Sequence, residues 1–287
     1  MSSSTKRFSI ELEKAEHAPE QRSPVRHQIG YLRSVRKLEG IIRLSLGISW
    51  VLGTASILVL MLLFLLPWRA ARIRLCNHYG RLMSPLVLWV VRARVQIIGK
   101  EHLVDAPPAI YVSNHTSMTD IFIGMWVCPV GGVGIAKKEV AKIPFFGWAY
   151  RLSGHLLIDR QNRDRAIAGL KETGQVVRDL GMSIWMWPEG TRSKDGRLRP
   201  LKKGFVHLAI ATGLPVVPVV VCGAQKNWPL KEMTSFYLTD IPIHVLEPID
   251  TSAWSVETMD QHLEEVHAAM AGRLPPDQKP MAQVESV

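Results

Sequence analysis

A long run of apolar residues near the N-terminus constrains the fold of this 287-residue chain more than any other feature. From Leu44 to Leu66, 23 consecutive residues lack a charged side chain. As an α-helix this run is roughly 34 Å long, which is enough to cross a hydrocarbon layer of about 30 Å. It is too long and starts too far from the N-terminus for a secretory signal, and Pro67 stops the helix. We therefore expect a membrane-anchoring segment over residues 41–92, preceded by a polar arm over residues 1–40.

Basic residues flank the apolar run on both sides, so charge does not determine its orientation in a membrane. Trp68 and the arginines after it suit an interfacial anchor against anionic headgroups. These arginines are Arg69, Arg72 and Arg74. A shorter apolar stretch at residues 82–91 permits either a single span or a pair of helices that enters and leaves the same leaflet. Both topologies stay open.

The charge of the chain indicates a polyanionic partner. Its 35 Lys and Arg residues against 25 Asp and Glu give a formal net charge of +10 at pH 7. Nucleic acid, anionic lipid and phosphorylated substrates all fit this charge. The three cysteines, Cys76, Cys128 and Cys222, form no C-x-x-C pair. Neither a disulfide framework nor a structural zinc site is therefore indicated.

Residues 93–273 show the pattern of an α/β domain, in which short β-branched runs alternate with helical segments. Amphipathic helices are expected over residues 162–180 and 255–272, the second with Val256 among its apolar positions. The last residues, 274–287, contain three prolines and are expected to form a tail. The predicted strands cover residues 95–98, 109–112, 133–136, 155–158, 183–187, 216–222 and 243–246.

The first candidate site is the stretch NHTSMTD, in which His115 follows a buried strand and Asp120 comes five positions later. Catalytic groups of α/β proteins lie on such loops at strand ends. If a helix starts near Ser117, its first turn brings Asp120 back to the imidazole Nδ1, which leaves Nε2 as a base. The alternative is that Ser117 and Asp120 only cap the helix and His115 is an ordinary loop residue. The spacing alone does not decide between them.

The second candidate site is the turn after the strand at residues 183–187, with the sequence WPEGTRS. Backbone N–H groups, a hydroxyl and a forked guanidinium suit a phosphate there. Arg192 would make the charge-assisted contact, and Glu189 would hold the loop or a substrate hydroxyl. A surface turn with a Glu–Arg ion pair is the alternative.

Two further blocks accompany these sites. One begins at Lys137 with KKEVAKIPFFGW and continues with GHLLIDR, which ends at Arg160. The cations and aromatic residues of KKEVAKIPFFGW suit an interfacial patch or a channel for an acyl chain, and the alternative is that the aromatic residues belong to an ordinary core. His155 and Asp159 lie four apart on a predicted strand, which does not give a metal pair the required geometry. LPVVPVVV reads as a buried strand entered through prolines.

Taken in this order, the four blocks resemble the lysophosphatidic acid acyltransferase family, the 1-acyl-sn-glycerol-3-phosphate acyltransferases, over roughly residues 93–225. The resemblance implies a glycerolipid acyltransferase-like α/β domain with a mixed sheet flanked by helices, plus an N-terminal membrane-anchoring helix or helix pair. It also implies transfer of a fatty acyl group from acyl-CoA or acyl carrier protein to the sn-2 hydroxyl of lysophosphatidic acid, which gives phosphatidic acid. No metal or other cofactor is expected besides the acyl donor.

The family motifs assign roles by position. The resemblance makes His115 the general base and Asp120 the residue that orients it. The residues implied in binding the acceptor phosphate or other parts of the substrates are Glu189, Gly190, Thr191, Arg192, Arg160 and Lys137. Because acceptor and product are lipids, the membrane segment keeps the domain at the bilayer surface, with membrane lipid as a partner and no nucleic acid. The expected location is an inner membrane, with the catalytic domain on its cytoplasmic side.

Two departures from the family pattern bear on acceptor choice or partners: Trp187 stands where Phe is usual, and the polar arm is longer than in compact members. Other acceptors, such as lyso-ornithine lipid or glycerol-3-phosphate, fit the same motifs. A non-catalytic lipid-binding protein and a thioesterase are the alternatives from other classes.

Overall fold

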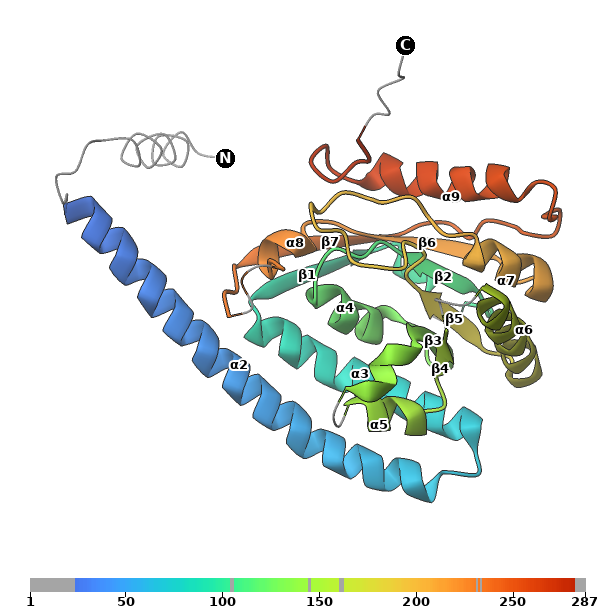
Figure 1. Ribbon diagram of the computed structural model, residues 1–287, viewed down its shortest axis with the longest axis horizontal. Helices are drawn as coiled ribbons and strands as arrows, with labels where there is room; N and C mark the ends of the chain where they lie inside the picture. The colour runs from blue at the N-terminus through green and yellow to red at the C-terminus, as the bar shows by residue number, and fades with distance from the viewer. Residues whose placement is uncertain are drawn as a thin grey trace, which may run out of the picture.

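The computed structural model describes residues 24–103, 106–143, 146–159, 163–230, 232 and 234–281. Its centre is a seven-stranded sheet in the order β1-β7-β6-β2-β5-β3-β4 (Figure 1). The strands are β1 (Ala93–Ile98), β2 (Ile110–Ser113), β3 (Gly132–Lys137), β4 (Leu156–Ile158), β5 (Ser183–Met186), β6 (Val216–Val221) and β7 (Thr239–Val245). The predicted α/β class with a mixed sheet flanked by helices is confirmed.

The five strands β6, β2, β5, β3 and β4 are parallel to one another, whereas β7 runs antiparallel to β6 and pairs in parallel with β1. The carboxyl ends of the five parallel strands therefore meet at one edge of the sheet. Loops at this edge are where open α/β sheets bind their ligands. Both candidate sites follow strands of this group, β2 and β5.

Helices cover both faces of the sheet, and each face has its own apolar core (Figure 1). One core includes residues of α6 (Arg163–Leu180), α7 (Gly204–Thr212) and α9 (Met259–Arg273). The other includes residues of α3 (Arg69–Val90) and α4 (Thr119–Val127). Strand β2 serves both, because Ile110 and Val112 face the first core while Tyr111 faces the second. A strand buried on both faces reads as a continuous apolar run, as this one does.

The apolar run lies in the long helix α2 (Pro24–Phe64) except for its last two residues, which belong to the turn that leads through Pro67 into α3. Its part Lys37–Phe64 is long and apolar enough to cross a membrane. The two helices run antiparallel and in contact: Arg43 reaches the carbonyl of Val90, and the hydroxyls of Thr54 and Tyr79 are 2.8 Å apart. The outer face of α2 is exposed and apolar. The predicted second apolar element, residues 82–91, is the C-terminal half of α3 rather than a short helix.

Two of the three arginines expected at a membrane interface also bond to the protein. The Arg69 guanidinium donates to the carbonyl of Gly154 at 3.0 Å, and Arg72 donates to that of Leu152 at 2.5 Å. They tie the start of α3 to the end of α5 (Phe146–Leu152) and the turn after it. Arg74 is exposed.

Three boundaries differ from the expectations. Strand β7 begins at Thr239, four residues before the expected start, and pairs with β1 from there. It contains Pro242, which lacks an N–H but accepts the Cys222 amide N–H through its carbonyl. Helix α9 begins at Met259, so Val256 stands outside it and is 61% exposed. In the described part of the expected tail, Leu274 and Gln278 are buried against the domain. The short elements are η1 (Lys100–His102), η2 (Lys138–Lys142) and α8 (Ala224–Asn227).

Candidate active site

The site forms where β2 and β5, which are parallel neighbours, end side by side. The loop after β2 carries His115, and the segment of residues 187–203 that connects β5 to α7 passes beside it. We call residues 187–203 the β5–α7 segment. On the other flank, the Asn114 amide bonds both backbone groups of Val221, with its Oδ1 accepting at 2.8 Å and its Nδ2 donating at 2.9 Å. These bonds join the ends of β2 and β6 and fix the start of the His115 loop.

His115 and Asp120 form the predicted pair. The imidazole Nδ1 lies 3.0 Å from Asp120 Oδ2, and Asp120 is 1% exposed. The same oxygen accepts the amide N–H groups of Thr116 at 2.5 Å and Ser117 at 2.7 Å. Helix α4 begins at Thr119, two residues after the expected start. The carboxylate thus does what each of the two sequence interpretations proposed: it binds the backbone ahead of the helix and orients the imidazole.

With Nδ1 engaged, Nε2 is the nitrogen of His115 that remains for a substrate. Trp187 stacks on the imidazole at a centroid distance of 4.6 Å and an interplanar angle of 21°. Trp185 packs edge-on against Trp187 at 6.4 Å. A methyl group at Gly124 of α4 would lie 2.9 Å from Trp185 Nε1 and 3.1 Å from Trp187 Cζ2, so only glycine leaves room for these two indoles. Trp187, noted as a departure from the family pattern, is therefore part of the wall around the base.

The β5–α7 segment holds the backbone of His115 at both ends of the residue. Glu189 Oε1 accepts the His115 amide N–H at 2.7 Å, and the Ser193 amide N–H donates to the His115 carbonyl at 2.8 Å. Glu189 Oε2 accepts the Arg199 amide N–H at 3.2 Å. Burial raises the pKa of the Glu189 carboxyl to about 8, although these two N–H donors oppose the rise. In this arrangement Glu189 holds the loop rather than facing a substrate.

The turn at Gly190 redirects the chain after β5. Gly190 has φ +77°, a conformation that glycine adopts without strain, and its amide bonds to the Trp187 carbonyl. Thr191 is exposed and Arg192 half-buried. Within the described part of the chain, the Arg192 guanidinium has no hydrogen-bond or ion-pair partner, so the Glu–Arg ion pair considered as an alternative does not form.

Two other predicted binding residues lie apart from this centre. Lys137 is exposed at the carboxyl end of β3, on the same edge of the sheet as His115. Its neighbour Lys138 forms an ion pair with Asp159 after β4, at 2.7 Å. Arg160 lies outside the described residues.

His155, which was not expected to share a metal ion with Asp159, bonds to the backbone of a neighbouring strand. His155 Nδ1 accepts the Gly134 amide N–H at 3.2 Å, and burial lowers the pKa of His155 to about 4. Among the described residues, no group of three or more His, Cys, Asp or Glu side chains could hold a metal ion.

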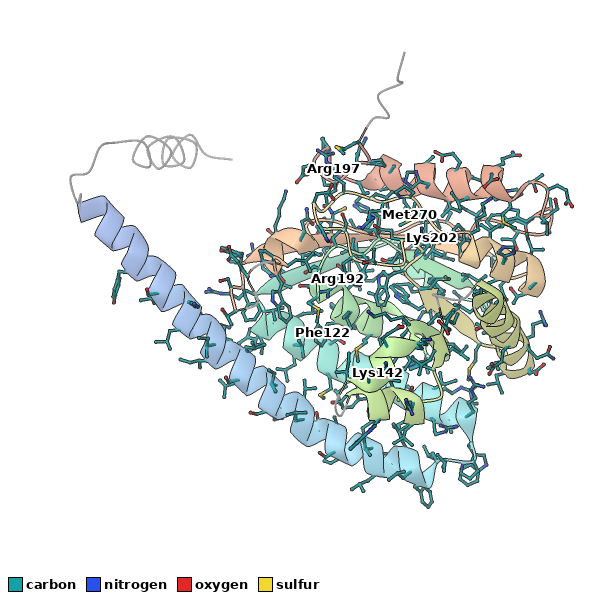
Figure 2. The ribbon with its side chains drawn as sticks, viewed as in Figure 1. Phe122, Lys142, Arg192, Arg197, Lys202 and Met270 are labelled. Carbon is teal, nitrogen blue, oxygen red and sulfur yellow. The ribbon has the colours of Figure 1, made fainter. Side chains whose placement is uncertain are left out.

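Two cations of the site were not identified from the sequence. The Arg199 amide donates to the Glu189 carboxylate, and the Lys202 amide donates to the Pro188 carbonyl at 2.8 Å. The end of the β5–α7 segment therefore lies beside its beginning. Both side chains are exposed. Arg192, Arg197 and Lys202 are spaced along the β5–α7 segment (Figure 2). The available signal was the dense run of cations in RSKDGRLRPLKK.

Comparisons with known proteins agree with this geometry. A family model described as Acyltransferase matches residues 94–222. A 1-acyl-sn-glycerol-3-phosphate acyltransferase of Limnanthes douglasii is 43% identical over 233 residues, 80% of this chain and 81% of the relative. The protein of that name from Escherichia coli K12 is 33% identical over 178 residues, 62% of this chain and 71% of the relative.

A solved structure shares the fold as well. The crystal structure of the 1-acyl-sn-glycerophosphate (LPA) acyltransferase of Thermotoga maritima matches with a TM-score of 0.65 and 26% identity, and the match covers 80% of this chain and 94% of that one. The four motif blocks, the fold and these relatives converge, and the chain belongs to the 1-acyl-sn-glycerol-3-phosphate acyltransferase family.

Proposed function

We propose that this chain transfers a fatty acyl group from a thioester donor, acyl-CoA or acyl carrier protein, to the sn-2 hydroxyl of lysophosphatidic acid. The observation that carries the proposal is the buried Asp120–His115 pair, held by the segment that also carries Arg192. The names of the relatives support the acceptor, because the proteins from Limnanthes douglasii and Escherichia coli are both 1-acyl-sn-glycerol-3-phosphate acyltransferases.

The proposed chemistry uses groups of the chain in one displacement. His115 Nε2 takes the proton of the sn-2 hydroxyl while that oxygen attacks the thioester carbonyl carbon. Asp120 keeps the proton on Nδ1 and stabilises the imidazolium that forms 3.0 Å away. The tetrahedral intermediate then collapses, the carbon–sulfur bond breaks and the thiolate leaves with the proton from the imidazolium. No acyl-enzyme forms in this scheme.

Arg192 is proposed to bind the acceptor phosphate. Its guanidinium has no partner within the described residues, and a forked guanidinium binds a phosphate through two charge-assisted hydrogen bonds. Thr191 and the exposed Arg199 and Lys202 add a hydroxyl and positive charge on the same segment. We propose Lys137, at the same edge of the sheet, and Arg160 as further contacts for phosphate or donor.

We propose that the enzyme acts at a membrane surface. The outer face of α2 exposes large apolar side chains, among them Leu46, Trp50, Leu60 and Phe64. On α3, Leu82 and Trp89 are exposed as well, at 71% and 68%. Apolar surface of this extent marks a membrane or protein contact, and lipid substrates favour the membrane. We propose an inner membrane with the catalytic domain on the cytoplasmic side.

An acyl-transfer assay in detergent tests the proposal. Labelled acyl-CoA or acyl carrier protein is offered with lysophosphatidic acid, lyso-ornithine lipid or glycerol-3-phosphate to the wild type, His115→Ala and Arg192→Ala. We expect phosphatidic acid from the wild type and none from His115→Ala, whereas Arg192→Ala should still turn over, with an acceptor KM that rises more than its donor KM. Product on another acceptor alone would replace the acceptor, free fatty acid as the sole product would indicate a thioesterase, and turnover by folded His115→Ala would remove the base.

A further inference from the structure

Residues 275–279, which follow α9 in the stretch expected to be a tail, are bound to the segment that holds the catalytic base. Gln278 is 0% exposed, although it lies in a polar, proline-rich stretch near the C-terminus. A buried side-chain amide is costly unless its polar groups are hydrogen-bonded. The partners of Gln278 therefore show what this stretch does.

Gln278 bonds to two loops at once. Its carbonyl accepts the Leu198 amide N–H at 2.9 Å, and its side-chain Nε2 lies 3.4 Å from the Gly196 carbonyl. Its Oε1 accepts the Gly223 amide N–H at 2.6 Å, just after β6. One residue thus joins the tip of the β5–α7 segment to the end of a central strand.

Three contacts of the residues next to Gln278 strengthen this attachment. The Arg197 guanidinium donates to the carbonyl of Lys279 at 2.9 Å and approaches that of Pro276 at 3.5 Å. Asp277 forms an ion pair with Lys226 of α8 at 2.6 Å. The β5–α7 segment thus also donates side-chain hydrogen bonds to residues 275–279, through Arg197.

The same segment reaches His115 at its other side. Ser193 bonds to the His115 carbonyl, and Arg199 bonds to Glu189, whose other oxygen holds the His115 amide. Residues 193 and 199 therefore bind the base, directly or through Glu189, while residues 196–198 between them bind Gln278 and its neighbours. Arg192 precedes this stretch directly.

We propose that residues 275–279 are a strap that positions the β5–α7 segment, and that Gln278 is its main positioning residue. Without the strap, the tip of the segment is free to move away from β6. The guanidinium of Arg192 then loses its fixed position, and so do the bonds of Glu189 and Ser193 to the His115 backbone, which we call the clasp. The part of this proposal that concerns acceptor binding rests on the proposed function of Arg192.

The test compares Gln278→Ala and Gln278→Met with the wild type in the full-length protein. The Met variant keeps the length of the side chain and the backbone bond to Leu198, and it removes only the side-chain hydrogen bonds to Gly196 and Gly223. Gln261→Ala, the same change as Gln278→Ala at an exposed position of α9, is the matched control. Arg197→Ala is a second test in case the Gln278 variants do not fold. It removes the side-chain bonds from the partly exposed Arg197 to residues 276 and 279 and leaves Gln278 in place.

Four quantities are measured: thermal unfolding, hydrogen–deuterium exchange of residues 193–199, and the KM values of lysophosphatidic acid and of the acyl donor. For Gln278→Met and Arg197→Ala we expect faster exchange of the Ser193, Leu198 and Arg199 amides. We also expect an acceptor KM raised on the order of tenfold with the donor KM changed much less, because a small misplacement of a binding group is costly. Gln261→Ala should match the wild type in all four.

Unchanged exchange in both strap variants would overturn the proposal, and so would equal rises in both KM values. The exchange result does not depend on the acceptor. If Arg192→Ala leaves the acceptor KM unchanged, the phosphate assignment fails on its own, and faster exchange in the strap variants still supports the strap.

Discussion

Asp120→Asn separates the catalytic role of Asp120 from its structural one. Asp120 Oδ2 accepts two backbone N–H groups ahead of α4 and also faces His115 Nδ1 at 3.0 Å. An asparagine oxygen can still accept both backbone groups, so the start of the helix keeps its partners. What the variant loses is the negative charge beside the imidazole.

The magnitude follows from the distance. A unit positive charge on His115 that forms 3.0 Å from a carboxylate is stabilised by about 5 kcal/mol at the effective dielectric constant of about 20 that suits such sites. Each 1.36 kcal/mol of lost transition-state stabilisation costs about tenfold in rate. We therefore expect kcat of Asp120→Asn to fall by about 10³-fold or more, with little change in either KM.

The assay is acyl transfer to lysophosphatidic acid, measured beside thermal unfolding for Asp120→Asn and Asp120→Ala. The Ala variant leaves two N–H groups unpaired, each at a cost of about 1–3 kcal/mol, so it should unfold at a lower temperature than the Asn variant. A folded Asp120→Asn enzyme within about tenfold of wild-type kcat would refute the reasoning. In that case Asp120 only caps the helix, as the alternative interpretation of the sequence holds.

Two further substitutions, Gly124→Ala and Glu189→Gln, test the surroundings of His115. Gly124→Ala places a methyl group 2.9 Å from Trp185 Nε1 and should lower kcat, because it displaces the indoles and pushes Trp187 against His115. The control is Gly272→Ala, where no atom lies within 4 Å of the new methyl group, and equal kcat values for the two variants would contradict the prediction. Burial raises the pKa of Glu189 from 4.5 to about 8, so the folded state holds a proton that the unfolded state has lost between those values. Glu189 should therefore lower the free energy of unfolding as pH rises from about 4.5 to about 8, by up to about 1.4 kcal/mol per pH unit, while buried His155, with its lowered pKa of about 4, raises that free energy between about 4 and 6.5. Denaturant titrations of the wild type and Glu189→Gln separate the two, because the difference between their free energies of unfolding should fall over this pH range, and parallel curves would refute the Glu189 contribution.

The sequence predicted what depends on local pattern. Short apolar runs, several of them rich in β-branched residues, indicated all seven strands. The five-residue spacing from His115 to Asp120 predicted their contact, because one turn at the start of a helix spans that distance. Helix α6 ends at Leu180, just before Gly181, where a helix stop was expected.

What escaped prediction depends on which strands are neighbours. The clasp of Glu189 and Ser193 on His115 exists only because β5 lies beside β2, and residue spacing carries no information on strand order. The bonds of Arg69 and Arg72 to the carbonyls of Gly154 and Leu152 could not be predicted, because these partners lie some 80 residues away in the sequence. Gln278 gave no signal at all, since a glutamine among prolines has the composition of a tail.

The apolar helix is joined to the active site by packed elements rather than by a flexible linker. Helix α2 packs along α3, and the other side of α3 packs on α4, whose first turn carries Asp120. Asn77 of α3 also bonds to the Gly131 amide at 2.8 Å and the Gly132 carbonyl at 3.1 Å, which fixes α3 to the start of β3. With α2 in a bilayer, as proposed, His115 therefore sits at a set height above the lipid. An acceptor anchored by its acyl chain presents its headgroup at a set height too, and a match between the two lets the lipid react without leaving the membrane.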